Sequence, residues 1–155
     1  MEHTMKSEKF SVAISPKIFN KDLEYLTNTI LNVTVQSSGF SANAEMDIDI
    51  EEFAVFSEIL KNIYDTLKGE AIITEPYGDM YISFKGDGKG YIYVEGYLHN
   101  FNDLCGMQEL RFENRFDQTY LKDFANDLYN SYKEYLPKEL FQNKLNNLQK
   151  IYSYF

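Results

Sequence analysis

The sequence predicts an α+β fold: a mainly antiparallel β-sheet with one mid-chain helix and C-terminal helices packed on it. Two adjoining periodicities carry this prediction. Hydrophobic and polar residues alternate over residues 41–50, as in a strand with one buried face. Apolar residues then recur every three or four positions over residues 51–68, as in an amphipathic helix. Strand patterns follow this helix before helical spacing returns, an order typical of α+β domains.

The other strand candidates are short segments rich in β-branched and aromatic residues. Before the mid-chain helix they are residues 9–15 and 29–38, and after it they are 70–75, 80–85, 90–98 and about 106–116. Residues 17–28, which follow Pro16, are polar and are predicted to be turn-like. Gly39 lies between two strand candidates, so an antiparallel hairpin is expected there.

The helix ends have sequence signals of their own. Asp49, with Glu52 three residues later, matches a capping box at the start of the mid-chain helix, and Gly69 is the expected stop. Asp117 or Thr119 is the expected cap of a second helix. The apolar positions expected on its buried side are Leu121, Phe124, Leu128, Tyr132 and Tyr135. Past Pro137, a short third helix is predicted from the spacing of Phe141, Leu145, Leu148 and Tyr152.

Composition limits the classes of protein that need considering. With 155 residues, 44% of them hydrophobic and 16% aromatic, the chain is expected to form one globular domain over residues 1–155. A net charge of −9 argues against binding a nucleic-acid backbone and favours a basic partner. The single cysteine, Cys105, fits a reducing cytoplasm, and neither a secretion signal nor a membrane-spanning run is visible.

Catalytic and cofactor signatures do not emerge from the residues. The two histidines are His3, expected near a frayed terminus, and His99, expected to be structural. The glycine cluster at residues 86–90 has neither the spacing nor the following helix of a phosphate-binding loop. Asp-Gly between two alternating runs is instead a hairpin signal. We therefore expect a non-enzyme with no catalytic residue, cofactor or metal.

An acidic ladder is the sharpest polar feature. Glu45, Asp47 and Asp49 share the polar face of the strand at residues 41–50, about 6.5–7 Å apart. Three interpretations stand side by side: a solvated strand face, a protein-binding surface, or a metal or catalytic site. The third has the least support, because the glycine and distal glutamate of a calcium loop are missing.

A second face is rich in tyrosine. Tyr91, Tyr93, Glu95 and Tyr97 alternate with Ile92, Val94 and Leu98 along one strand. If the aliphatic residues meet the helices, the tyrosines line the far face, where they either pack under another layer or form an interface. The expected partner-binding residues are accordingly Glu45, Asp47, Asp49, Tyr91, Tyr93, Glu95 and Tyr97.

Three segments in fixed order carry a family resemblance. They are MDIDIEEFAVFSEILKNIYDTLKG, MYISFKGDGKGYIYVEGYL and QELRFENRFDQTYLKDFANDLYNSYKEYL. Together they resemble the WapI-family immunity proteins of bacterial polymorphic toxin systems, over about residues 33–136. In that family, too, a strand follows a glycine turn and an Asp-led helix closes the domain.

The resemblance implies a cytoplasmic antidote. Such a protein binds a cognate toxin domain, often a nuclease, and blocks it without chemistry of its own. The alternative is a small cytosolic interaction or regulatory module with another partner. A third reading, a carboxylate-dependent hydrolase, would require Asp47 and Asp49 to be catalytic.

Overall fold

The computed structural model describes residues 1–137 and confirms the α+β class, with its strands divided between two four-stranded antiparallel sheets. The strands of the first sheet, in spatial order, are β1 (His3–Lys6), β2 (Phe10–Ile18), β3 (Thr29–Ser37) and β4 (Phe40–Ile48). Those of the second are β5 (Lys68–Thr74), β6 (Tyr81–Asp87), β7 (Tyr91–Asn102) and β8 (Gly106–Asp117). The helices are α1 (Ile50–Thr66) and α2 (Lys122–Tyr132).

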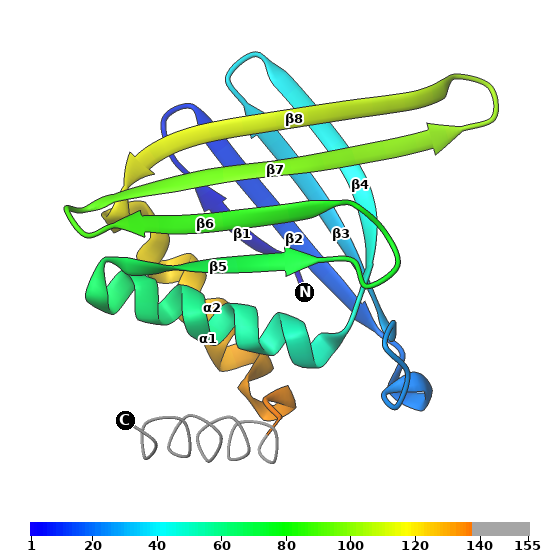
Figure 1. Ribbon diagram of the computed structural model, residues 1–155, viewed down its shortest axis with the longest axis horizontal. Coiled ribbons are helices and arrows are strands. Elements are labelled where there is room, and N and C mark those ends of the chain that lie inside the picture. Colours follow the sequence, from blue (N-terminus) through cyan, green and yellow to red (C-terminus); the bar gives the residue numbers. More distant parts are fainter. Residues whose placement is uncertain (138–155) are drawn as a thin grey trace, which may run out of the picture.

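The two sheets pack face to face, with their strands crossing, and α1 runs alongside β5 (Figure 1). Alternate residues of each strand point into the shared core, including Val33 and Met46 from the first sheet and Phe84 and Val94 from the second. Both helices add their apolar faces to the same core. Each sheet therefore keeps one outer face, and the polar residues of the alternating strands lie there.

Helix α1 begins where predicted and ends earlier than predicted. Its N-cap is Asp49, whose carboxylate accepts the backbone N–H of Glu51 at 3.0 Å. The expected stop at Gly69 is wrong, because Leu67 takes the left-handed conformation with φ 64° and Gly69 already belongs to β5. The Leu67 carbonyl then accepts the N–H of Gly88 at 2.7 Å, which ties the helix end to the β6–β7 hairpin.

The glycine cluster forms that hairpin, as the sequence predicted. Gly88 and Gly90 have φ values of 80° and 108°, a region that favours glycine. The Asp87 carboxylate accepts the N–H groups of Lys89 and Tyr91 at 2.6 and 3.1 Å. These hydrogen bonds, led by the one from Lys89, lower the pKa of Asp87.

Two expectations about the N-terminal region are wrong. His3 is not frayed: it lies in β1, pairs with Ile14 of β2 and is 1% exposed. Strand β2 also continues through Pro16 to Ile18 instead of ending at residue 15. A proline is tolerated there because β1 pairs with β2 only as far as Ile14, so β2 is an edge strand at that point.

The second predicted helix is present in altered form. Its first turn is a 3₁₀ helix at Gln118–Leu121, and the Asp117 carboxylate accepts the Thr119 N–H at 2.9 Å. Hydrogen bonds from Thr119 lower the pKa of Asp117. Of the five apolar positions expected on its buried side, four are buried and Tyr135 is half-buried. The third helix predicted after Pro137 lies outside the described residues.

A buried polar cluster joins β1 to α2. His3 Nδ1 donates to the Asp127 carboxylate at 2.5 Å, and its Nε2 accepts the hydroxyl of Tyr132 at 2.7 Å. Tyr132 is 6% exposed, and burial, reinforced by the charge of Asp127, raises its pKa from 10.0 to about 12.

That raised pKa predicts a loss of stability in alkali. Between pH 10 and 12 the unfolded chain loses a Tyr132 proton that the folded protein keeps, so stability present below pH 10 falls as pH rises. By pH 11.5 the fall is expected to be about 2 kcal/mol beyond that of a Tyr132→Phe variant. Urea unfolding of both proteins at pH 9 and 11.5 measures it. Equal falls in the two proteins would contradict the assignment.

Candidate partner-binding site

The structure places the two sets of predicted partner-binding residues on different sheets. Glu45 and Asp47 are exposed on the outer side of β4 in the first sheet. Tyr91, Tyr93 and Glu95 are exposed on the outer face of β7 in the second sheet. The two sets therefore lie on strands of different sheets.

Asp49 is not part of an open surface. It is half-buried, caps α1 and accepts a second hydrogen bond from the amide of Asn28 at 3.1 Å. Asn28 also accepts the backbone N–H of Ile50 at 2.9 Å. Asp49 therefore stabilises the junction between β4 and α1. Because the hydrolase hypothesis requires both Asp47 and Asp49 to be catalytic, this structural role of Asp49 argues against it.

Glu45 and Asp47 instead line an open hollow of about 580 Å³ together with the β5–β6 connection. We call it the acidic hollow. Its lining residues are Glu45, Asp47, Glu75, Tyr77, Gly78, Asp79, Met80 and His99. Four of these eight residues carry carboxylates, none is Lys or Arg, and the Tyr77 side chain stands 78% exposed beside them.

The hollow is built where the second sheet meets the free edge of the first. In the described residues β4 is an edge strand, so some of its backbone groups point away from β3. Glu75 accepts the N–H of Asp47 at 3.0 Å, and Asn100 of β7 donates to the carbonyl of Asn43 at 3.3 Å. These bonds cover the edge and bring the β5–β6 connection beside Glu45 and Asp47.

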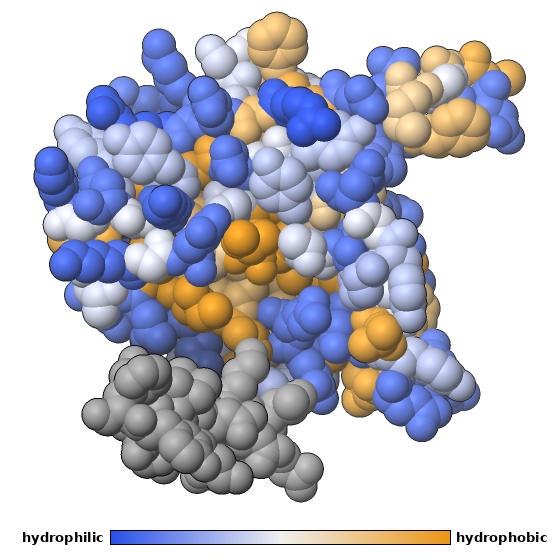
Figure 2. Space-filling view, viewed as in Figure 1, coloured by the Kyte–Doolittle hydropathy of each residue, from blue (hydrophilic) through white to orange (hydrophobic). Residues whose placement is uncertain are grey.

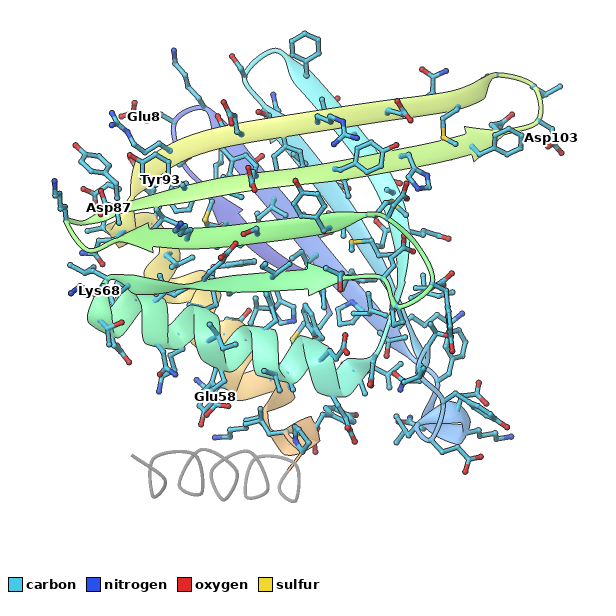
Figure 3. All side chains as sticks on the ribbon, in the orientation of Figure 1. Glu8, Glu58, Lys68, Asp87, Tyr93 and Asp103 are labelled. Carbon is cyan, nitrogen blue, oxygen red and sulfur yellow. The ribbon has the colours of Figure 1, made fainter. Side chains whose placement is uncertain are left out.

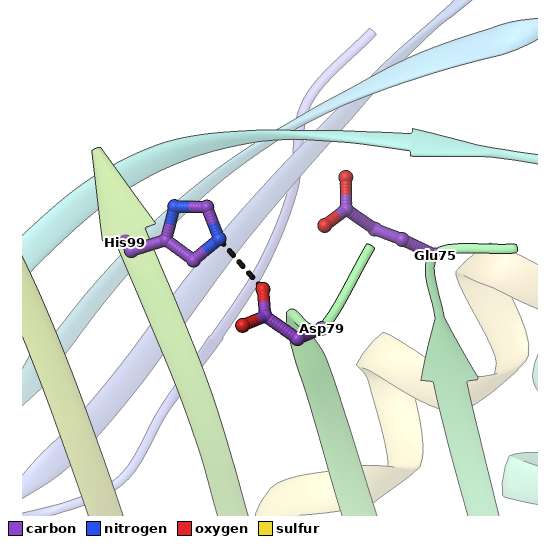
Figure 4. A group of neighbouring side chains, drawn as sticks. All are labelled: Glu75, Asp79 and His99. Carbon is purple, nitrogen blue, oxygen red and sulfur yellow. Dashed lines mark hydrogen bonds and ion pairs between the residues drawn. The ribbon is translucent and has the colours of Figure 1, made fainter. Parts of the chain in front are cut away.

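His99 closes one side of the hollow. Its Nε2 lies 2.8 Å from a carboxylate oxygen of Asp79, and Glu75 faces the pair (Figure 4). One ligand atom from each of these three residues lies within 4.8 Å of the others, a spacing that could accommodate a divalent cation. The sequence predicted a structural role for His99. Its imidazole also forms part of this surface.

In the described part of the chain, the carboxylates of the hollow have no Lys or Arg partner. Within residues 1–137, no Lys or Arg lies within ion-pair distance of Glu45, Asp47, Glu75 or Asp79. His99 is the one basic group that pairs with any of them in that part of the chain. Like charges held together in a concave surface raise the local attraction for cations.

The second set forms what we call the tyrosine face, the outer face of β7 with its neighbours on β6 and β8. In Figure 1 this face is turned to the viewer, and no helix of the described residues lies over β6 to β8; Figure 3 labels Tyr93 on it. Arg111 lies over the Tyr97 ring, 4.2 Å from its centroid, and Arg115 over the Tyr91 ring at 4.5 Å. Tyr91 and Tyr93 are 43% and 45% exposed.

Tyr97 differs from the other two tyrosines because it is 6% exposed. Its hydroxyl donates to Glu109 at 2.6 Å, and this hydrogen bond is the main reason that its pKa is raised. Around Tyr93 and Glu95 lies a second hollow of about 580 Å³, lined by residues of both signs that include Lys85 and Glu113. The tyrosine face is therefore an aromatic surface of mixed charge.

Sequence reasoning missed the β5–β6 side of the acidic hollow. Glu75, Tyr77 and Asp79 belong to the six-residue β5–β6 connection, EPYGDM, whose first and last residues were predicted to belong to the flanking strands. An aromatic residue between two acids in a turn was the available signal. Nothing in the sequence indicates that this turn lies against β4, because that contact joins residues 28 positions apart.

Comparison with known proteins identifies the family. The model of the immunity protein WapI-like family matches residues 6–136. The chain belongs to the WapI-like immunity protein family. The match confirms the resemblance noted in the sequence and supports an immunity function, which implies a cognate toxin.

Other comparisons add little to the WapI-like assignment. No curated protein sequence matches the chain. Among solved structures, the crystal structure of WHY1 from Arabidopsis thaliana is similar, with a TM-score of 0.47 and 10% identity over 96% of this chain and 92% of that one. In residues 1–137, no helix is both long and apolar enough to span a membrane.

Proposed function

We propose that this WapI-like protein is a cytoplasmic antidote that neutralises one cognate bacterial toxin domain, a nuclease, by binding it without catalysis. The acidic hollow is the observation that carries the proposal. A nuclease must attract a polyanionic backbone and so presents clustered Lys and Arg around its active site. Four carboxylates without a Lys or Arg neighbour in residues 1–137 complement such a surface.

Electrostatic complementarity of this kind acts first on the association rate. The net charge of −9 draws a basic partner from a distance, and the hollow then orients it. Tyr77, which is 78% exposed at the rim, adds an aromatic contact of the type that interfaces favour. Tyr91 and Tyr93 on the tyrosine face, with Glu95, remain candidate anchors for a partner that extends around the molecule.

Removing charge from the hollow is expected to slow binding. A Glu45→Gln, Asp47→Asn, Asp79→Asn variant keeps side-chain shape and should associate at least about tenfold more slowly at low salt, with a weaker salt dependence. The probe is the toxin domain that is expected, under this proposal, to be encoded next to this gene, inactivated for purification. Stopped-flow association rates at several ionic strengths measure the effect.

A matched control separates local from global charge. A Glu8→Gln, Glu24→Gln, Asp65→Asn variant changes the net charge by the same amount at exposed positions outside the hollow. Its association rate should fall much less. Equal slowing of the two triple variants would show that the hollow has no special role.

Two further assays address the proposed function itself. Co-expression of this protein with the toxin domain should restore growth, and the purified complex should not cleave RNA or DNA that the free toxin cleaves. Absence of both rescue and complex formation would overturn the antidote role. A toxin that stops growth without cleaving nucleic acid would overturn only the nuclease assignment.

A further inference from the structure

A projecting arm extends beyond the second sheet. Strand β6 pairs with β7 only as far as Tyr97, whereas β7 and β8 continue to pair up to Asn102 and Gly106. Residues 98–110 therefore form a two-stranded ribbon that reaches past β4 (Figure 1). The sequence-based strands, which ended at residue 98 and began again at about 106, did not predict this extension.

Large apolar side chains are exposed around the tip of the arm. Leu104 is 94% exposed, Phe101 63% and Met107 52%, and Cys105 is exposed between them. In Figure 2 the end of the arm stands clear of the body, with hydrophobic residues among hydrophilic ones. Leu104 lies in the turn, and Phe101 and Met107 face each other on the two strands beside it. Turns are normally built from polar residues and glycine, so three large exposed apolar side chains around one projecting turn point to a binding role.

Local hydrogen bonds also stabilise the turn at the tip. The Asn102 side chain accepts the N–H of Leu104 at 2.8 Å, and its carbonyl accepts the N–H of Cys105 at 3.1 Å. Gly106 has a φ of 76°, which closes the turn, and Gln108 donates to the Cys105 carbonyl at 3.3 Å. A preformed loop loses little conformational entropy when it binds.

The arm is continuous with the acidic hollow. Beneath it lies a hollow of about 500 Å³, whose lining includes Phe40, Leu98 and Leu110. His99 lines both this space and the acidic hollow. The base of the arm therefore adjoins the acidic hollow, and of the exposed tip residues Cys105 lines this space whereas Phe101, Leu104 and Met107 do not.

We propose that the tip of the arm is the apolar anchor of the toxin complex: Leu104 and Phe101 enter a cleft of the toxin while the acidic hollow holds basic residues beside that cleft. The inference rests on the proposed function. Asp103 at the tip (Figure 3) and the net charge of −9 oppose an anionic membrane or a second copy of this chain and favour a basic protein.

The two parts of the interface predict different kinetic effects. A Phe101→Ser, Leu104→Ser variant should bind the same inactivated toxin domain at least about 30-fold more weakly, through faster dissociation. Leu104→Ala alone should show the same direction with a smaller effect. Leu26→Ser, at another exposed leucine that is 57% accessible, is the matched control and should bind like the wild type.

Cys105, the single cysteine of the chain, gives a second readout. Its reaction with a maleimide, followed by mass spectrometry of this chain, should be at least about tenfold slower in the toxin complex than in the free protein, because the tip is then covered.

The possible outcomes distinguish the anchor from the proposed function. A complex that forms with unchanged affinity in the arm variants and leaves Cys105 reactive overturns the anchor while the proposed function stands. A wild-type dimer, detected by light scattering and lost in the arm variants, also overturns it, because the tip then binds a second copy. No binding by the wild-type protein ends the proposed function and the anchor together. Circular dichroism of each variant confirms that it is folded.

Discussion

Replacing Gly86 by alanine is expected to lower the free energy of unfolding by about 3 kcal/mol. Gly86 lies in β6, where the end of α1 crosses it. A Cβ at this position would lie 2.8 Å from the carbonyl carbon of Leu67 and would press on its carbonyl oxygen. That carbonyl is backbone, and its hydrogen bond to the N–H of Gly88 fixes it. No side-chain rotation can relieve the clash.

The matched control is Gly39→Ala at the β3–β4 hairpin. An added Cβ there meets nothing within 4 Å, and Gly39 does not have a positive φ, so the change should stay within about 0.5 kcal/mol. Urea unfolding midpoints, compared at equal m-values, give both numbers. If Gly86→Ala were as harmless as the control, α1 and β6 could not lie as close as described.

A His3→Ala variant is expected to lose about 3 kcal/mol of stability. The substitution removes both hydrogen bonds of the buried imidazole, leaves the Tyr132 hydroxyl without a partner at a 6%-exposed position, and opens a cavity between β1 and α2. Asp127, which is on the surface side of the cluster with its side chain 55% exposed, can be rehydrated and should add little to the cost.

Thr4→Ala tests the same strand without the cluster. Thr4 is the exposed neighbour of His3 in β1, and its replacement should cost less than about 1 kcal/mol. A double-mutant cycle with Tyr132→Phe then isolates the His3–Tyr132 bond, and His3→Ala should be less costly when Tyr132 is already Phe. Strict additivity in chemical unfolding would mean that the two side chains do not interact.

Local sequence patterns were sufficient to predict the elements whose stability depends on residues close together in the chain. The alternation over residues 41–50 predicted β4 because a one-sided strand needs a period of two, and the helical spacing after it predicted α1. Asp87 and Gly88 predicted the β6–β7 turn because few residues adopt its backbone conformation. The order of these pieces was also sufficient to indicate the WapI-like family.

Interactions between residues that are far apart in the chain were not predicted from the sequence. His3 was expected to be frayed because its partners, Asp127 and Tyr132, are more than 120 positions away. Sequence spacing likewise gave no sign that α1 would end at Thr66, with Leu67 as its C-cap, before Gly69, since the Leu67 carbonyl is held by Gly88 of a later hairpin.

The candidate site shows the same division. Its carboxylates on β4 were visible in the sequence as a polar strand face, and so were the tyrosines on β7. Their separation onto two sheets, and the meeting of Glu45 and Asp47 with Glu75, Asp79 and His99, depend on how the second sheet packs against the free edge of β4. A strand period specifies which residues share a face, but only tertiary packing decides which faces lie side by side.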